Sequence, residues 1–228
     1  MKKKKLPLLQ NIEITGIAAE GKALTRVDDM VLFVPYCVPG DIVDIQVTRK
    51  KHSFMEGRAE RIVTPSPVRC APRCKHYGEC GGCKWQILPY EEQLRHKQQQ
   101  ILDNLTRIGK VELPEISPIL GSHEIYEYRN KLEFTFSDRK WLSWDTIHAA
   151  GGLENLDNTH GLGFHIPNCF DKVLDITECH LMPDINNSIR NGVRDFARQL
   201  GITFYNEHAH EGQLRTLILR SNHKGEIM

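Results

Sequence analysis

Three cysteines lie close together in the stretch "CKHYGECGGC", at Cys74, Cys80 and Cys83. A C-x-x-C pair lets two thiolates approach one centre, and the glycines between the last two cysteines let the backbone turn tightly and direct N–H groups at sulfur. The chain begins with a basic segment that no apolar stretch follows, so we expect no secretion signal and a reducing, cytoplasmic location. In that setting, clustered cysteines predict metal ligands rather than disulfides.

Three local thiols need a fourth ligand, and the spacing alone leaves the choice open. Cys179, in "ITECHL", is the leading candidate and Cys70 is the local rival, whereas Cys37 and Cys169 fit better as small core residues. With Cys70, the set would resemble a compact structural zinc site, although the usual pair-and-pair spacing is absent. With Cys179, three clustered cysteines and one distant cysteine form a pattern that is typical of iron–sulfur clusters.

The segment before the cysteines predicts a small β-domain. Residues 8–64 alternate short β-branched runs with turn signals, which favours four or five strands closed into a barrel. Basic and aromatic side chains gather near one hairpin, at Arg49, Lys50, Lys51 and Phe54. On a small barrel this combination is typical of nucleic-acid binding, although a charged hairpin can also serve only to keep a strand edge soluble.

The distribution of charge supports a polyanionic partner for the front half. Residues 1–110 contain 19 Lys and Arg against 12 Asp and Glu, whereas residues 111–228 contain 11 against 17. An excess of positive charge of this kind can follow a phosphate backbone. The sequence has no apolar run long enough to span a membrane, so we expect no membrane partner, and we expect a monomer.

The remaining helices and strands are predicted from hydrophobic periodicity and from the residues that typically begin or end an element. A proline-rich linker at "TPSPVRCAPR" precedes a helix over residues 88–109, which ends at Gly109. A second helix is expected over residues 184–201, with Asp184 as N-cap and Gly201 as the stop. Its predicted apolar face consists of Ile185, Ile189, Val193, Phe196 and Leu200. The alternating segments 128–138 and 214–223 predict strands, and the non-periodic residues 145–161 predict an exposed loop.

Several of these motifs together resemble a known family. The pattern C-x5-C-G-G-C, followed by "WQ", a glutamine-rich helix, "YRNK", "GLGFH" and "ITECHL", is similar to the RNA (uracil-5-)-methyltransferases that act on 23S ribosomal RNA. The resemblance implies an OB-like TRAM barrel over residues 1–67. It also implies a central α+β domain over residues 68–84 and 113–228, and a helical segment, residues 85–112, that packs on a catalytic domain. The expected fold class is therefore mainly β with helices.

The resemblance also implies cofactors and contacts. It assigns Cys74, Cys80, Cys83 and Cys179 as ligands of a four-iron, four-sulfur cluster. It assigns Arg129 and Lys131 as RNA contacts, in place of the simpler interpretation that they are outward-facing strand residues. Family enzymes bind S-adenosylmethionine in a Rossmann-like domain and use a nucleophilic cysteine and a general base, and none of these is visible in this sequence.

We therefore predict the RNA-recognition portion of a 23S ribosomal RNA methyltransferase, with no catalytic residues and no cofactor-binding loop of its own. S-Adenosylmethionine would be used only by the full-length enzyme. The alternatives are a stand-alone RNA-binding module with a structural zinc or iron–sulfur site, and an electron-transfer protein.

Overall fold

A computed structural model describes residues 6–167 and 169–228, so the lysine run at residues 2–5 lies outside the described part. The chain divides into two compact units. Unit 1 comprises the chain up to Pro72 together with Lys84–His123, and unit 2 comprises Arg73–Cys83 together with Glu124–Met228. No helix in the described part is long and apolar enough to cross a membrane.

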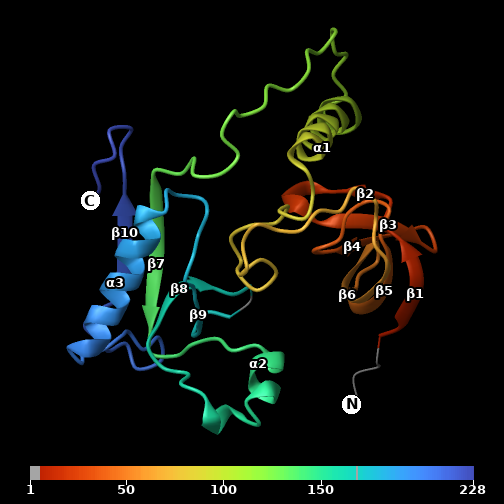
Figure 1. The fold of residues 1–228 in the computed structure, drawn as a ribbon. Helices are drawn as coiled ribbons and strands as arrows, with labels where there is room; N and C mark the ends of the chain where they lie inside the picture. The colour runs from red at the N-terminus through yellow and green to blue at the C-terminus, as the bar shows by residue number, and fades with distance from the viewer. Residues whose placement is uncertain (1–5, 168) are drawn as a thin grey trace. The chain divides into compact units, whose positions relative to one another are not determined.

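Unit 1 is built on a six-stranded sheet with the order β1-β5-β6-β4-β3-β2 (Figure 1). Its strands are β1 (Leu8–Glu13), β2 (Gly16–Ile17), β3 (Ala23–Val27), β4 (Met30–Val34), β5 (Ile42–Lys50) and β6 (Phe54–Thr64). Neighbouring strands are antiparallel except β4 and β6, which are parallel. Tight turns separate the strands, as the turn signals predicted in general: Gly40 has φ +86°, and Asp28 and Asp29 also adopt positive φ before β4.

The sheet curls into a half-barrel where the sequence predicted a closed barrel. Its two edge strands, β1 and β2, are consecutive in the chain and are separated by Ile14 and Thr15. Irregular register within the β1/β5 and β5/β6 pairs bends the sheet, as bulges do. Because β2 has only two residues, it offers little edge for further pairing.

The core of unit 1 follows directly from alternation along the strands. In β5, Val43, Ile45 and Val47 point inward and are almost fully buried, while the residues between them are more polar. The same cluster contains Ile14, Ala23, Leu32, Val34, Cys37 and Met55. Cys37 is therefore a core residue, as predicted, and burial raises the pKa of its thiol to about 12.

The predicted first helix is present in unit 1 as α1 (Tyr90–Asp103), and a π-helical turn continues it over Asn104–Ile108. Gly109 follows that turn, where the sequence predicted the end of the helix. The apolar side chains toward the end of this helical segment are largely uncovered in the described chain: Ile101 is 55% exposed and Ile108 is 78% exposed. The assignment of this face to a catalytic domain stays a prediction.

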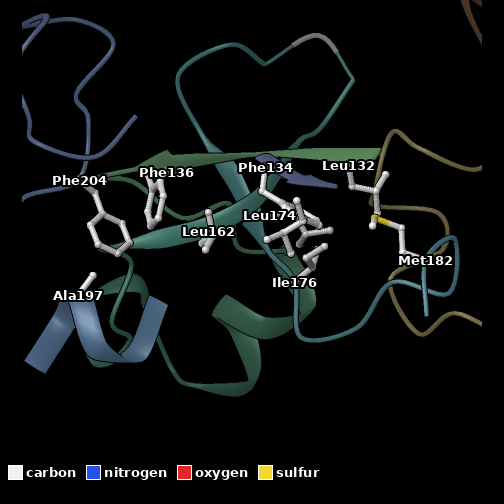
Figure 2. Packing of buried hydrophobic residues seen from close by; sticks show 10 residues of the cluster. Leu132, Phe134, Phe136, Leu162, Leu174, Ile176, Met182, Ala197 and Phe204 are labelled. Carbon is white, nitrogen blue, oxygen red and sulfur yellow. The ribbon is translucent and has the colours of Figure 1, made fainter. Parts of the chain in front are cut away.

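Unit 2 contains a four-stranded antiparallel sheet with the order β10-β7-β8-β9. Its strands are β7 (Lys131–Ser137), β8 (Gly161–His165), β9 (Val173–Asp175) and β10 (Thr216–Arg220). Helix α3 (Ile185–Gln199) contributes Ala197 to the core. Figure 2 shows Phe134, Phe136 and Leu162 extending from the sheet into this core.

The predicted apolar face of α3 is only partly turned to the core: Ile189 and Val193 pack against it, but the other three residues do not. Ile185, Phe196 and Leu200 are more than half exposed, and Arg190 and Arg194 are buried instead. Polar side chains can be buried where they find hydrogen-bond partners, and α3 meets such partners on its inner side. Gly201 ends the helix in the left-handed conformation, with φ +64°. Asp184 precedes the helix, but its side chain makes no capping hydrogen bond to the backbone.

The predicted loop over residues 145–161 is mostly exposed, but it is not irregular throughout. It contains most of a short helix, α2 (Trp144–Ala149), and a 3-10 turn over Leu153–Asn155. Ser143 caps α2 by accepting a hydrogen bond from the backbone N–H of Thr146 at 3.1 Å. A six-residue helix is too short to show a period in the sequence, so only the cap could have indicated it.

Candidate functional site

The cysteine loop of unit 2 is ordered by its own backbone. The N–H of Tyr77 donates to the carbonyl of Cys74 at 3.1 Å, and the N–H of Cys80 donates to the carbonyl of His76 at 2.9 Å. The N–H of Gly82 points at the Cys80 sulfur at 3.4 Å. This last contact is the N–H-to-sulfur interaction that the glycine pair predicted.

The loop lies beside the segment that carries Cys179, about a hundred residues later. The N–H of Lys75 donates to the carboxylate of Glu178 at 3.0 Å. The N–H of Thr177 donates to Nε2 of His76 at 3.1 Å. These two hydrogen bonds, formed by residues next to Cys74 and Cys179, therefore bring the two cysteine-bearing segments together.

The thiols are close enough to influence one another. Burial raises the pKa of Cys80 to about 11; the N–H of Gly82 lowers it, and the thiols of Cys83, Cys179 and Cys74 raise it again. Burial also raises the pKa of Cys179, where the backbone of Leu181 acts in the opposite direction. Burial and mutual repulsion thus favour the neutral thiols, and a cation bound among them would favour the thiolates.

The thiols nevertheless do not converge on one point. Among the described residues, no three His, Cys, Asp or Glu side chains are close enough together to hold a single metal ion. Cys70 belongs to unit 1, where its thiol donates to the carbonyl of Gln86 at 3.5 Å. Cys169 donates to a carboxylate oxygen of Asp171 at 3.3 Å. Neither of these cysteines appears among the thiols that act on Cys80.

Two polar residues of α3 that were not predicted lie near Cys179, one in direct contact with it and one linked through the first. The Oδ1 atom of Asn187 accepts from the N–H of Cys179 at 2.8 Å, and its Nδ2 donates to the Cys179 carbonyl at 3.3 Å. Arg190 donates from Nη1 to the same Asn187 oxygen at 2.9 Å. The available signal was the repetition of arginine every four residues along α3, at Arg190, Arg194 and Arg198.

The predicted basic hairpin lies at the end of β5 and the start of β6. The hairpin is closed by the N–H of Lys51, which donates to the carbonyl of Phe54 at 2.9 Å. Lys50 and Lys51 are exposed, and Arg49 forms an exposed ion pair with Glu56 at 3.5 Å. Such a pair is weak enough for a phosphate to compete with it. The Phe54 ring is half-buried and packs edge-on against Phe33, with the ring centroids 6.0 Å apart.

A second basic patch lies on unit 2, where the sequence analysis placed Arg129 and Lys131. Both residues are exposed, and the N–H of Arg129 donates to the carbonyl of Leu181 at 2.8 Å. Lys131 stands directly opposite Arg220 in the β7/β10 register. Two like charges facing each other across strands destabilise a sheet, so an anion bound between them would relieve the repulsion. Arg220 was missed because only strand register brings it next to Lys131.

Comparison with known proteins finds several proteins that are similar to this chain. Residues 11–68 match the family model described as the TRAM domain of tRNA (uracil(54)-C(5))-methyltransferase. The chain is 55% identical over 212 residues to a Bacteroides thetaiotaomicron protein named "Uncharacterized RNA methyltransferase", covering 93% of this chain and 46% of that protein. A Porphyromonas gingivalis protein of the same name is 50% identical over 219 residues, covering 95% and 47%.

A solved structure shows the same fold over most of the chain. The crystal structure of Pyrococcus abyssi tRNA (uracil-54, C5)-methyltransferase in complex with S-adenosyl-L-homocysteine matches with a TM-score of 0.60 and 24% identity. The match covers 96% of this chain and 44% of that one. The chain thus spans about half the length of the curated relatives it matches. It has homologues that are named RNA methyltransferases, and its residues 11–68 match a TRAM domain.

Proposed function

We propose that this chain is the RNA-recognition portion of an S-adenosylmethionine-dependent RNA (uracil-5-)-methyltransferase, with 23S ribosomal RNA as its substrate. The observation that supports this most strongly is the 55% identity to a protein named an RNA methyltransferase, over 93% of the chain. The match of residues 11–68 to a TRAM domain from a uracil-C5 methyltransferase points to the same chemistry. The described residues bind the RNA, and the rest of the full-length enzyme binds the methyl donor.

The proposed RNA binding uses two exposed basic surfaces. Arg49, Lys50 and Lys51 provide charge for phosphate at one hairpin, where they stand out from the sheet. Arg129, Lys131 and Arg220 provide a second group of cations on unit 2. The target uridine must leave its stack before C5 can be methylated, and contacts to the flanking backbone hold the RNA in that opened form.

We further propose that Cys74, Cys80, Cys83 and Cys179 hold a four-iron, four-sulfur cluster. The donor set fits such a group: thiols from two adjoining segments act electrostatically on one another, and an N–H is directed at sulfur. In a four-iron cluster each thiolate binds a different iron, so the four thiols need not approach one another as closely as the ligands of a single zinc ion do. When bound, the cluster would tie residues 74–83 to residue 179 and stabilise unit 2.

The substrate is tested by methylating RNA with the full-length protein and measuring 5-methyluridine by mass spectrometry. Unmodified 23S ribosomal RNA and unmodified transfer RNA are compared, because the TRAM match and the solved structure both carry the name of a transfer-RNA enzyme. We expect 5-methyluridine in 23S ribosomal RNA. Methylation of transfer RNA alone would overturn the ribosomal substrate and keep the reaction.

The division of labour is tested with the 228-residue chain itself. We expect this chain to bind RNA with a strong salt dependence and to transfer no methyl group. Methylation by the purified chain would show that it carries the catalytic site. Salt-independent binding would contradict the proposed phosphate contacts.

A further inference from the structure

Three arginines follow one another along the inner side of α3, and two of them are neutralised by the same carboxylate. Arg194 donates from Nη1 to Oδ1 of Asp175 at 3.2 Å, and Arg198 donates from Nη2 to Oδ2 of Asp175 at 3.1 Å. Arg190, the first of the three, forms no ion pair with a carboxylate anywhere in the described part of the chain.

Arg190 is nevertheless the most deeply buried of these charges, with only 1% of its surface exposed. Both of its hydrogen bonds go to neutral amides: to Oδ1 of Asn187 at 2.9 Å and to Oδ1 of Asn191 at 3.2 Å. Its Nε is buried without a partner among the described residues, and its guanidinium stacks over the Phe134 ring at 5.2 Å. A buried cation with neutral neighbours is costly, so the site needs an anion nearby.

The cysteine centre lies where that anion would be needed. Asn187 links the two directly, because its side-chain oxygen accepts from both Arg190 and the N–H of Cys179. The Cys179 thiol and the Arg190 guanidinium also lie within electrostatic range of each other. Asp175 and Asp184 act on Arg190 from a distance, but neither is hydrogen-bonded to it: Asp175 binds Arg194 and Arg198, and Asp184 accepts from Nδ2 of Asn187.

We propose that Arg190 is the buried counter-charge of the cysteine centre, and that it holds Cys179 in place through Asn187. The inference rests on the proposed cluster, because four thiolates and their irons together carry net negative charge. Arg190 is a positioning residue in this arrangement. Arg190 sets how firmly the cysteines retain the cluster and how readily the cluster accepts an electron, since a nearby cation stabilises the more negative, reduced form.

The test compares anaerobically purified wild-type protein with R190M, R190K and R198M. Methionine keeps most of the side-chain stem but removes the charge, and lysine keeps the charge. R198M removes the same charge from the same row while Arg194 still holds Asp175. R190Q is the second charge-free variant, in case R190M does not fold by circular dichroism. The readouts are iron and sulfide per chain, the rate of iron loss to a chelator, and the reduction potential.

We expect the charge-free Arg190 variants to release iron at least about tenfold faster than wild type. Where the cluster persists, its reduction constant should fall about tenfold, a downward shift of about 59 mV for one electron. R190K and R198M should behave like wild type. Equal behaviour of R190M and R198M, or equal iron loss from R190M and R190K, would overturn the role of the charge while leaving the cluster intact. Wild-type protein that holds no iron would overturn the cluster and this inference together.

Discussion

The two units bury different kinds of side chain. In unit 1, the sheet buries an almost purely aliphatic core. Asp41, which is fully buried there, forms an ion pair with Arg69. In unit 2, the core around Phe134 and Phe136 is bordered by arginine, asparagine and cysteine. Unit 1 can therefore be stable through apolar burial, whereas unit 2 combines an apolar core with buried polar groups that must be paired.

The largest effect is expected from removing a cysteine of unit 2. Cys179→Ala should lose the cluster as completely as Cys83→Ala, because each removes one of four ligands. Hydrogen-exchange protection should then fall in unit 2 and stay unchanged in unit 1. Iron analysis and exchange mass spectrometry measure both quantities. Cys70→Ala is the matched control, and retention of full metal by Cys179→Ala together with loss from Cys70→Ala would reverse the ligand assignment.

The next effect is expected at the buried ion pair of unit 1. Asp41 is 0% exposed and accepts from the N–H groups of Val38 and Ser66 and from Arg69, whose Nη2 lies 2.7 Å away. Asp41→Ala removes the charged partner of Arg69 and the acceptor of two buried N–H groups, so we expect a loss of about 3–5 kcal/mol in the free energy of unfolding. Urea titration measures it. Glu60→Ala, which breaks an exposed ion pair with Arg58, should cost about 1 kcal/mol or less.

The same carboxylate should make unit 1 sensitive to acid. Burial raises the pKa of Asp41, but the hydrogen bonds from Arg69, Ser66 and Val38 outweigh burial and hold the pKa below its usual value. A lowered pKa in the folded state adds stability above the unfolded pKa of about 3.9, and this stability is lost as the pH falls through the folded pKa. Melting temperatures from pH 6 to pH 2 should fall less steeply in Asp41→Asn than in wild type. If the melting temperatures of the two proteins fell in parallel with pH, another group would control the loss of stability in acid.

A smaller effect separates two glycines within unit 2. A Cβ on Gly163 would meet the carbonyl oxygen of Leu174 at 2.1 Å, so Gly163→Ala forces β8 and β9 apart. We expect it to cost about 1–3 kcal/mol or more. A Cβ on Gly192 would meet nothing within 4 Å, so Gly192→Ala on α3 should stabilise by about 0.4–1 kcal/mol. Thermal melts of both variants test this, and a destabilised Gly192→Ala would mean that the outer face of α3 is covered.

The smallest effect on stability is expected at the basic hairpin. Replacing Arg49, Lys50 and Lys51 with alanine should change the free energy of unfolding by less than about 0.5 kcal/mol, because all three are exposed. RNA binding should weaken, and the slope of log affinity against log salt should fall by about 1 for each phosphate that the variant no longer binds. Fluorescence anisotropy at several salt concentrations measures the slope. Arg58→Ala serves as the control, and an unchanged slope in the triple variant would remove the hairpin from the RNA interface.

The sequence by itself determined many of the helices and strands and the candidate ligands, but α2, β8 and β9 were not predicted. Alternation predicted the strands of the curled sheet, glycines predicted where α1 and α3 stop, and the spacing of Cys74, Cys80 and Cys83 suggested metal ligands, because these signals are local. Sequence reasoning placed Ile189 and Val193 of α3 inward correctly, but it missed the buried Arg194, because spacing along the chain does not reveal that Asp175 binds Arg194 and Arg198.

Only the tertiary structure decided which distant residues meet. The hydrogen bonds from residues 75 and 177 bring Cys179 to the cysteine loop. Strand register places Arg220 against Lys131, and helix packing carries Arg190 to Cys179 through Asn187. Contacts of this kind depend on how whole elements pack and which polar partners they find inside, and neither property is written in the spacing of residues along the chain.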